Sequence, residues 1–142
     1  MKKFVTTSPK ETAEVAKQLA TRLRGGEVIA LYGNLGAGKT TFAQALAKAL
    51  GIKKRVQSPT FILMQEYPLT KRGALKAFLH VDAYRGDVAQ LSAVGLTEYL
   101  GRPDTVVLVE WADRIQTMLP KKMITVRMTH RGADARAITV AG

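Results

Sequence analysis

The chain has 142 residues, of which 46% are hydrophobic and 23% charged, as expected for one globular domain with a continuous core. Its 22 basic and 11 acidic residues give a formal charge of +11, which favours polyanionic ligands or acidic protein faces as partners. Cysteine is absent, which excludes disulfides and thiolate metal sites. No apolar run approaches the roughly 18 residues that a membrane span needs, so we expect no membrane partner.

The residue pattern predicts helices and strands in alternation along the chain. Ser8-Pro9-Lys10-Glu11 is a capping box with proline at the first helical position, and the helix that it opens ends at Gly25-Gly26. Further helices are expected at residues 41–50, at 87–100 with a break at Gly95, and at 112–119. Strands are expected at residues 27–32, 61–67, 75–81, 105–109, 123–128 and 137–140.

Two pairs of these strands are predicted to form antiparallel hairpins. Residues 61–67 and 75–81 are joined by the polar turn 69–73, and residues 123–128 and 137–140 flank Arg131-Gly132. The alternation of the remaining elements predicts an α/β fold, a mixed sheet flanked by helices in a single domain over residues 1–142. In such folds ligands bind at the C-terminal ends of the parallel strands.

A complete phosphate-binding motif, G-x-x-x-x-G-K-[ST], lies between the strand 27–32 and the helix 41–50. It reads Gly33-Asn34-Leu35-Gly36-Ala37-Gly38-Lys39-Thr40. In that position the loop N–H groups and the helix N-terminus form a cradle for an anion. Lys39 is expected to reach the β- and γ-phosphates and Thr40 to ligate Mg²⁺, so the motif predicts binding of a nucleoside triphosphate, with the cytoplasm as the expected location.

Acidic residues follow two of the later predicted strands. Glu110 ends the more apolar strand and is favoured as the metal carboxylate, whereas Asp82 is expected to orient the attacking water or to hold a metal-bound water. A hydroxyl of Ser58-Pro59-Thr60 either senses the γ-phosphate or belongs to an ordinary proline turn. Trp111 is either a buried anchor or a reporter of nucleotide binding, and His80 is assigned no chemistry.

The base of the bound nucleotide is partly indicated by the absence of a guanine-recognition motif. No Asn-Lys-x-Asp element for guanine occurs in the chain, which favours adenine and therefore ATP. No arginine is placed by its sequence position to complete the site, although Arg85, Arg114, Arg131 and Arg136 are available. We therefore expect slow hydrolysis by the chain alone and faster turnover with partners.

Five motifs together resemble the TsaE family over nearly the whole chain. They are Gly-Asn-Leu-Gly-Ala-Gly-Lys-Thr-Thr (33–41), Ser-Pro-Thr-Phe (58–61), His-Val-Asp-Ala-Tyr-Arg (80–85), Gly-Leu-Thr-Glu-Tyr-Leu (95–100) and Glu-Trp (110–111). The resemblance implies an ATPase needed for threonylcarbamoyladenosine modification of tRNA. It also implies TsaB and TsaD as partners, contact with tRNA through their complex, and TsaC as the source of threonylcarbamoyl-adenylate.

The resemblance also implies roles for individual residues. Lys39, Asp82 and Thr60 would be catalytic, and Thr40 and Glu110 would hold Mg²⁺. The ATP contacts that it implies come from Gly33, Asn34, Leu35, Gly36, Ala37, Gly38, Lys39, Thr40, Thr41, Asp82 and Trp111, with Ser8, Pro9 and Arg136 near the adenine.

Two other functions fit the phosphate loop. A small-molecule kinase would use the same loop, but it needs an acceptor pocket and an arginine-bearing lid, for which 142 residues leave little chain. A nucleotide-gated adaptor would use ATP to order residues 58–60 for a partner, with hydrolysis incidental. Whether the basic surface contacts tRNA or acidic partner faces is left open by the sequence.

Overall fold

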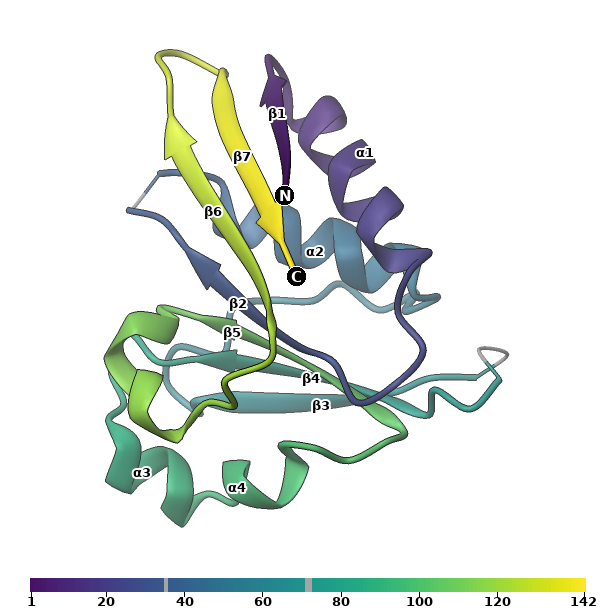
Figure 1. The fold of residues 1–142 in the computed structure, drawn as a ribbon, viewed down its shortest axis with the longest axis vertical. Helices are drawn as coiled ribbons and strands as arrows, with labels where there is room; N and C mark the ends of the chain where they lie inside the picture. Colours follow the sequence, from purple (N-terminus) through teal and green to yellow (C-terminus); the bar gives the residue numbers. More distant parts are fainter. Residues whose placement is uncertain (35, 71–72) are drawn as a thin grey trace.

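The computed structural model describes residues 1–34, 36–70 and 73–142. These residues form a seven-stranded sheet in the order β1-β7-β6-β2-β5-β4-β3 (Figure 1). The strands are β1 (Lys2–Thr6), β2 (Val28–Tyr32), β3 (Met64–Pro68), β4 (Ala77–Asp82), β5 (Thr105–Glu110), β6 (Ile124–His130) and β7 (Arg136–Ala141). The helices are α1 (Pro9–Ala20), α2 (Lys39–Ala49), α3 (Val88–Ala93), α4 (Leu96–Tyr99) and the 3₁₀ helix η1 (Ala112–Met118). The expected α/β class and both predicted hairpins are confirmed.

The centre of the sheet is parallel and its margins are antiparallel. Strands β6, β2, β5 and β4 run in the same direction. Strand β3 pairs antiparallel with β4, β7 with β6, and β1 with β7. Every residue of β4 and β5 is buried, as expected for parallel strands covered on both faces.

Two hydrophobic cores cover the two faces of this sheet. Ile29 and Leu31 of β2 belong to the core under α1 and α2, whereas Val28 and Ala30 belong to the core under α3, α4 and η1. This alternation follows from the two-residue period of a strand. The sheet therefore holds β2, β4 and β5 rigidly between two layers of helices, and their C-terminal ends carry the residues that the sequence singled out.

Local residues set the start of α1 and the break between α3 and α4 as the sequence predicts. The Ser8 hydroxyl accepts a hydrogen bond from the Glu11 N–H at 3.2 Å, with Pro9 at the first helical position. The predicted break at Gly95 is also present, because Gly95 has a φ of +97° and separates α3 from α4. No helix in the described part of the chain is long and apolar enough to cross a membrane.

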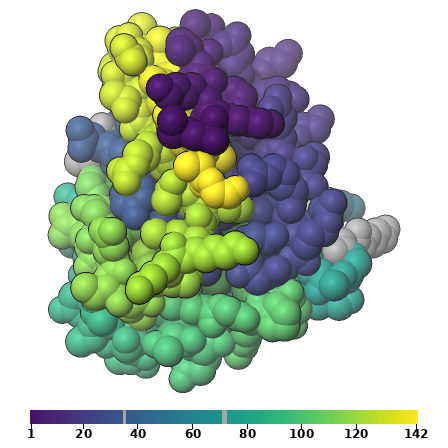
Figure 2. All heavy atoms as spheres, viewed as in Figure 1, coloured from purple at the N-terminus to yellow at the C-terminus, as the bar shows by residue number. Residues whose placement is uncertain are grey.

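The strand β1 was not predicted, because it is a short and mostly exposed edge strand whose pairing partner is at the other end of the chain. It pairs with β7 in the register Lys2↔Val140. The N-terminal segment and the C-terminal hairpin consequently form one continuous surface (Figure 2).

Two element boundaries and the type of one helix also differ from the expectations. Helix α1 ends at Ala20, and not at the predicted Gly25-Gly26. Strand β3 begins at Met64 and not at Phe61, because Leu63 has a φ of +71° and its N–H donates to the Pro59 carbonyl at 2.7 Å. The expected helix 112–119 is a 3₁₀ helix with non-helical backbone at Ile115. Part of the predicted turn 69–73, residues 71–72, lies outside the described residues.

Candidate nucleotide-binding site

The phosphate loop joins the end of β2 to the start of α2 and leaves the helix N-terminus open. Gly38 is the N-cap of α2, with a φ of +96° and no side-chain capping bond, and the first turn of α2 has no acidic residue. The positive φ favours glycine there, whereas the nearest atom to an added Cβ would be the flexible end of the Met128 side chain at 3.2 Å. The free N–H groups and the helix dipole favour an anion at this end of α2. Leu35 lies outside the described residues.

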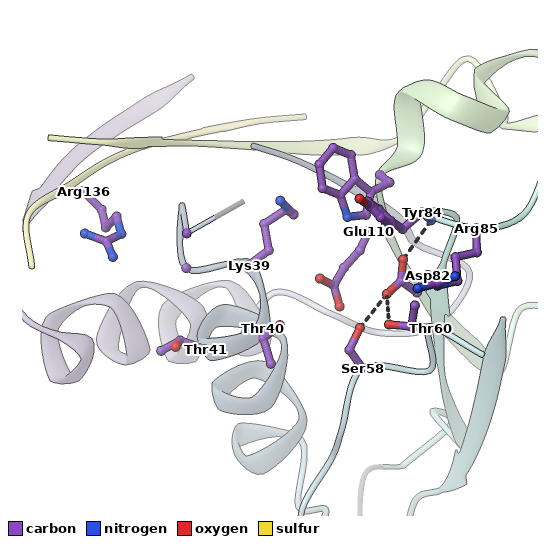
Figure 3. Close-up of a pocket in the computed structure, with 13 residues that line it drawn as sticks. Lys39, Thr40, Thr41, Ser58, Thr60, Asp82, Tyr84, Arg85, Glu110 and Arg136 are labelled. Carbon is purple, nitrogen blue, oxygen red and sulfur yellow. Dashed lines mark hydrogen bonds between the residues drawn. The ribbon is translucent and has the colours of Figure 1, made fainter. Parts of the chain in front are cut away.

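A cavity of about 560 Å³ lies beside this loop and collects most of the residues that the sequence predicts for the site (Figure 3). It is lined by Gly36, Gly38, Lys39, Thr40, Thr41, Ser58, Thr60, Asp82, Tyr84, Arg85, Glu110, Trp111 and Arg136. Gly33 and Asn34 line a neighbouring cavity that also contacts Trp111. A single cavity thus joins the phosphate loop, both candidate carboxylates and the hydroxyls of residues 58–60.

Lys39 is folded back onto its own loop. Its ammonium group donates to the carbonyl of Gly33 and to that of Asn34, the latter at 3.0 Å, and lies 4.2 Å from the centroid of the Trp111 ring. Burial lowers the pKa of Lys39 below its ordinary value, and the carboxylates of Glu110 and Asp82 partly oppose this effect. A phosphate group entering the cavity would offer this cation a stronger partner than two carbonyls and a ring face.

Asp82 and Glu110 end neighbouring parallel strands and stand next to each other. They are register partners in the β4–β5 ladder, and each is at most 3% exposed. Figure 3 shows both side chains directed to the same cavity, on the side of Lys39 opposite to Arg136. Two carboxylates from adjacent strand ends therefore face the phosphate loop together, as the sequence predicts.

The carboxylate of Asp82 is held by three donors. Its Oδ2 accepts from the Ser58 hydroxyl at 2.6 Å and from the Thr60 hydroxyl at 3.0 Å, and its Oδ1 accepts from the Tyr84 N–H at 2.9 Å. The sequence left residues 58–60 as either a phosphate sensor or an ordinary proline turn. The hydrogen bonds connect this segment to the site, while its response to a phosphate stays a prediction.

His80, to which the sequence analysis assigned no chemistry, contacts one of the two candidate carboxylates. Its Nε2 and the Oε2 of Glu110 are 2.5 Å apart, and both side chains are buried. Because the carboxylate accepts, the imidazole donates from Nε2, and within the described residues Nδ1 has no hydrogen-bond partner. A histidine inside an otherwise apolar buried strand needs a hydrogen-bond partner, so the sequence already indicated that His80 contacts another polar group. The identity of that partner required the β4–β5 pairing.

The donor set of the cavity suits Mg²⁺. The exposed Thr40 and the Glu110 carboxylate both line the cavity. Of the two carboxylate oxygens of Glu110, only Oε2 accepts a hydrogen bond from the described parts of the chain. The described residues contain no cluster of three or more His, Cys, Asp or Glu that would enclose a metal ion. Mg²⁺ in nucleotide sites uses one or two protein ligands with phosphate oxygens and waters, which matches this sparse set.

The residues expected near adenine are less closely grouped. Arg136 lines the cavity on the far side of the loop, where its Nε donates to the Ala37 carbonyl at 3.1 Å. Ser8 caps α1, and neither Ser8 nor Pro9 lines the cavity. Contact of Ser8 and Pro9 with the base therefore stays a prediction.

Comparisons with known proteins agree on one family. The sequence model of the family described as Threonylcarbamoyl adenosine biosynthesis protein TsaE matches residues 6–138. A relative named tRNA threonylcarbamoyladenosine biosynthesis protein TsaE from Bacillus subtilis (strain 168) is 40% identical over 137 residues, covering 96% of this chain and 83% of the relative. The protein of the same name from Aquifex aeolicus (strain VF5) is 41% identical over 116 residues, covering 80% and 79%.

A solved structure supports the same assignment. The crystal structure of Bacillus subtilis YdiB matches with a TM-score of 0.79 and 37% sequence identity, covering 98% of this chain and 83% of that chain. The match extends over the whole sheet and its helices. It therefore confirms the fold predicted from the phosphate loop and its flanking elements.

The His80–Glu110 contact gives a stability prediction. Replacing His80 with phenylalanine leaves the buried Glu110 carboxylate without its donor, so we expect a loss of about 3 kcal/mol in the free energy of unfolding. His130→Phe, at an exposed position of β6, is the matched control and should change stability by less than about 0.5 kcal/mol. Urea unfolding measures both, and equal stability of the two variants would contradict the assignment.

The lowered pKa of Lys39 gives a pH prediction. Between that lowered pKa and the ordinary 10.5, the unfolded chain binds a proton that the folded chain has released, so the free energy of unfolding rises with pH. Lys39→Met removes this contribution, whereas Lys3→Met, at an exposed site, retains it. Urea unfolding followed by circular dichroism over a pH series that ends at the ordinary 10.5 should show a smaller rise for Lys39→Met alone. Identical pH dependence of all three proteins would refute this account of Lys39.

Proposed function

The chain belongs to the TsaE family, and on this premise we propose that it is a magnesium-dependent ATPase acting in threonylcarbamoyladenosine synthesis on tRNA. The observation that carries the ATPase proposal is the cavity in which the phosphate loop faces both Asp82 and Glu110. The tRNA part is supported by the names of relatives that are 40% and 41% identical.

Binding of the triphosphate is the task of the loop, α2 and Lys39. The open N-terminus of α2 supplies N–H donors, and Gly36 and Gly38 bring the backbone close to the phosphate oxygens. Lys39 would exchange the carbonyls of Gly33 and Asn34 for the β- and γ-phosphates. The same movement would take its charge away from the Trp111 ring, which makes this only tryptophan of the chain a reporter of nucleotide binding.

Thr40 and Glu110 are the residues that would hold Mg²⁺. When bound, Mg²⁺ neutralises negative charge that develops on the phosphate oxygens. His80 contributes by fixing the Glu110 carboxylate through its Oε2. The hydrogen bond leaves the other carboxylate oxygen for the cavity and limits the rotamers of Glu110.

Asp82 is the residue that we assign to the attacking water. In-line attack on the γ-phosphorus needs a group that orients the water, and Asp82 lies in the cavity with Lys39. Its own orientation is set by the Ser58 and Thr60 hydroxyls and the Tyr84 N–H. Thr60 would thereby contribute to catalysis by orienting Asp82, and it also lines the cavity in which the reaction would occur.

The arginines near the cavity are occupied by other contacts, which supports slow hydrolysis by the chain alone. The Arg136 guanidinium donates to the carbonyls of Ala37, Ala133 and Ala135. Arg85 lies over the Phe61 ring, and the Arg114 guanidinium lies 5.3 Å from the Tyr84 ring centroid and 5.6 Å from that of Trp111. An added arginine finger raises rates by roughly 10³–10⁵-fold in related phosphoryl transfer. We therefore propose that TsaB and TsaD complete or rearrange the site, in the cytoplasm where ATP and tRNA meet.

A nucleotide-gated adaptor is the second candidate function. One observation favours it: the Ser58 and Thr60 hydroxyls bond to Asp82. A phosphate that binds near Asp82 would change these hydrogen bonds, and with them the conformation of residues 58–60 that a partner could contact. In that case ATP binding alone would serve the partners. The two functions differ in whether hydrolysis is needed.

Replacing Asp82 with asparagine tests the ATPase proposal. The variant keeps the loop and Lys39, so it should bind ATP but release phosphate about 10²–10³-fold more slowly, as for loss of one preorganised group. Asp134→Asn, at an exposed hairpin position, is the control with the same chemical change. Phosphate release is measured with the chain alone and with TsaB and TsaD added. Unchanged release by Asp82→Asn, or fast release by the chain alone that partners do not alter, would contradict the proposal.

A further inference from the structure

A groove of basic residues that the ATPase proposal does not use lies between the end of α2 and the start of β3. We name it the basic groove and define it by the exposed cations Lys48, Lys53, Lys54 and Arg55. Lys54 and Arg55 line two neighbouring cavities, of about 610 and 410 Å³. The groove therefore extends along this segment from the α2 surface to residues 57–62.

The charge of this groove is uncompensated. Residues 28–65 contain no Asp or Glu. Among the described residues, none of the four cations has a carboxylate within ion-pair distance. Their positive potentials add, and a polyanion entering the groove would displace no internal partner.

An aromatic side chain stands at the end of the groove. Phe61 is 83% exposed and lines the same cavity as Lys54 and Arg55. The guanidinium of Arg85, distant in sequence, lies 4.9 Å from the centroid of its ring. In the sequence no aromatic residue interleaves with the basic clusters, but the fold supplies this aromatic and guanidinium pair beside them. Such pairs stack on unpaired bases.

We propose that the basic groove binds the phosphate backbone of RNA, with a base stacked on Phe61. An acidic protein face is the competing partner, but protein interfaces are depleted in lysine, and three of the four cations here are lysine. Nucleic-acid interfaces are far more positive and combine phosphate contacts with stacking. The choice of tRNA as this RNA rests on the proposed function, whereas the groove itself does not.

The groove also adjoins the candidate active site. Ser58 and Thr60 line the cavity that contains Phe61, and their hydroxyls donate hydrogen bonds to Asp82 in the candidate active site. RNA in the groove would therefore contact the segment that orients Asp82. Within the described chain, this is the one segment that lines both the active-site cavity and the cavity of Phe61 and also donates side-chain hydrogen bonds to a carboxylate.

The test measures binding of a fluorescently labelled tRNA transcript to the chain alone by fluorescence anisotropy, without ATP or partners. The double substitution Lys53→Glu and Lys54→Glu should weaken binding by more than about ten-fold at low salt and lower the slope of log affinity against log salt by about one to two. Lys121→Glu with Lys122→Glu, an exposed pair between η1 and β6, removes the same charge elsewhere and should change affinity by less than about two-fold. Phe61→Ala should weaken binding by about ten-fold with the slope unchanged.

Three outcomes would overturn the proposal. They are no tRNA binding by the wild type at low salt, equal losses in the two double variants, or an affinity that neither Lys53→Glu with Lys54→Glu nor Phe61→Ala reduces. Loss of TsaB and TsaD binding with tRNA binding retained would assign the groove to a protein partner. Thermal melts and the Trp111 fluorescence response to ATP check the fold and the nucleotide site in every variant. Because RNA binding is measured without hydrolysis, its failure and a failure of the ATPase proposal are distinguishable.

Discussion

The parallel pairing of β4 with β5 and of β5 with β2 is the constraint on which the rest of the structure depends. It brings Asp82 and Glu110 into register and places both beside the loop that follows β2. Strands β4 and β5 are short and fully buried, and their covered position between two helical layers makes their terminal carboxylates part of a cavity. The site is therefore a property of the sheet, and the loop alone would bind phosphate without the groups that act on it.

The polar residues of this cavity support one another in a buried setting. His80 holds Glu110, three donors hold Asp82, and Lys39 rests on its own loop. Burying such polar groups costs desolvation free energy, which their hydrogen bonds offset. The hydrogen bonds also fix the side-chain rotamers of the site before a ligand binds. The basic groove shares Ser58 and Thr60 with this cavity, so nucleotide and polyanion would contact the same segment.

The sequence predicted those parts of the structure that depend on local chemistry. The phosphate loop, the N-cap at Ser8, the break at Gly95 and the two acidic strand ends all carry local signals, whereas the reciprocal bond of the predicted capping box joins Glu11 to the Thr7 N–H and not to that of Ser8. It did not predict β1, since an exposed edge strand is defined by a partner at the other end of the chain. The start of β3 was misplaced because the turn at Pro59 overrides the β propensity of Phe61-Ile62.

The contacts of the site required the fold. The residues near His80 in the sequence do not indicate its partner, because Glu110 is on another strand. The register His80↔Leu108 brings the two side chains together. The Phe61–Arg85 pair is equally non-local. Residue types were thus predictable and their pairings were not, since pairings depend on strand order and register.

The central claim is that hydrolysis at this cavity, and not nucleotide binding alone, serves tRNA modification. The most direct measurement is the threonylcarbamoyladenosine content of tRNA over several turnovers in a reconstituted reaction with TsaB, TsaD and the product of TsaC. Wild-type chain, Asp82→Asn and no chain are compared. We predict that Asp82→Asn supports no more modification than the reaction without the chain. Sustained modification by a variant that binds ATP without hydrolysing it would contradict the account.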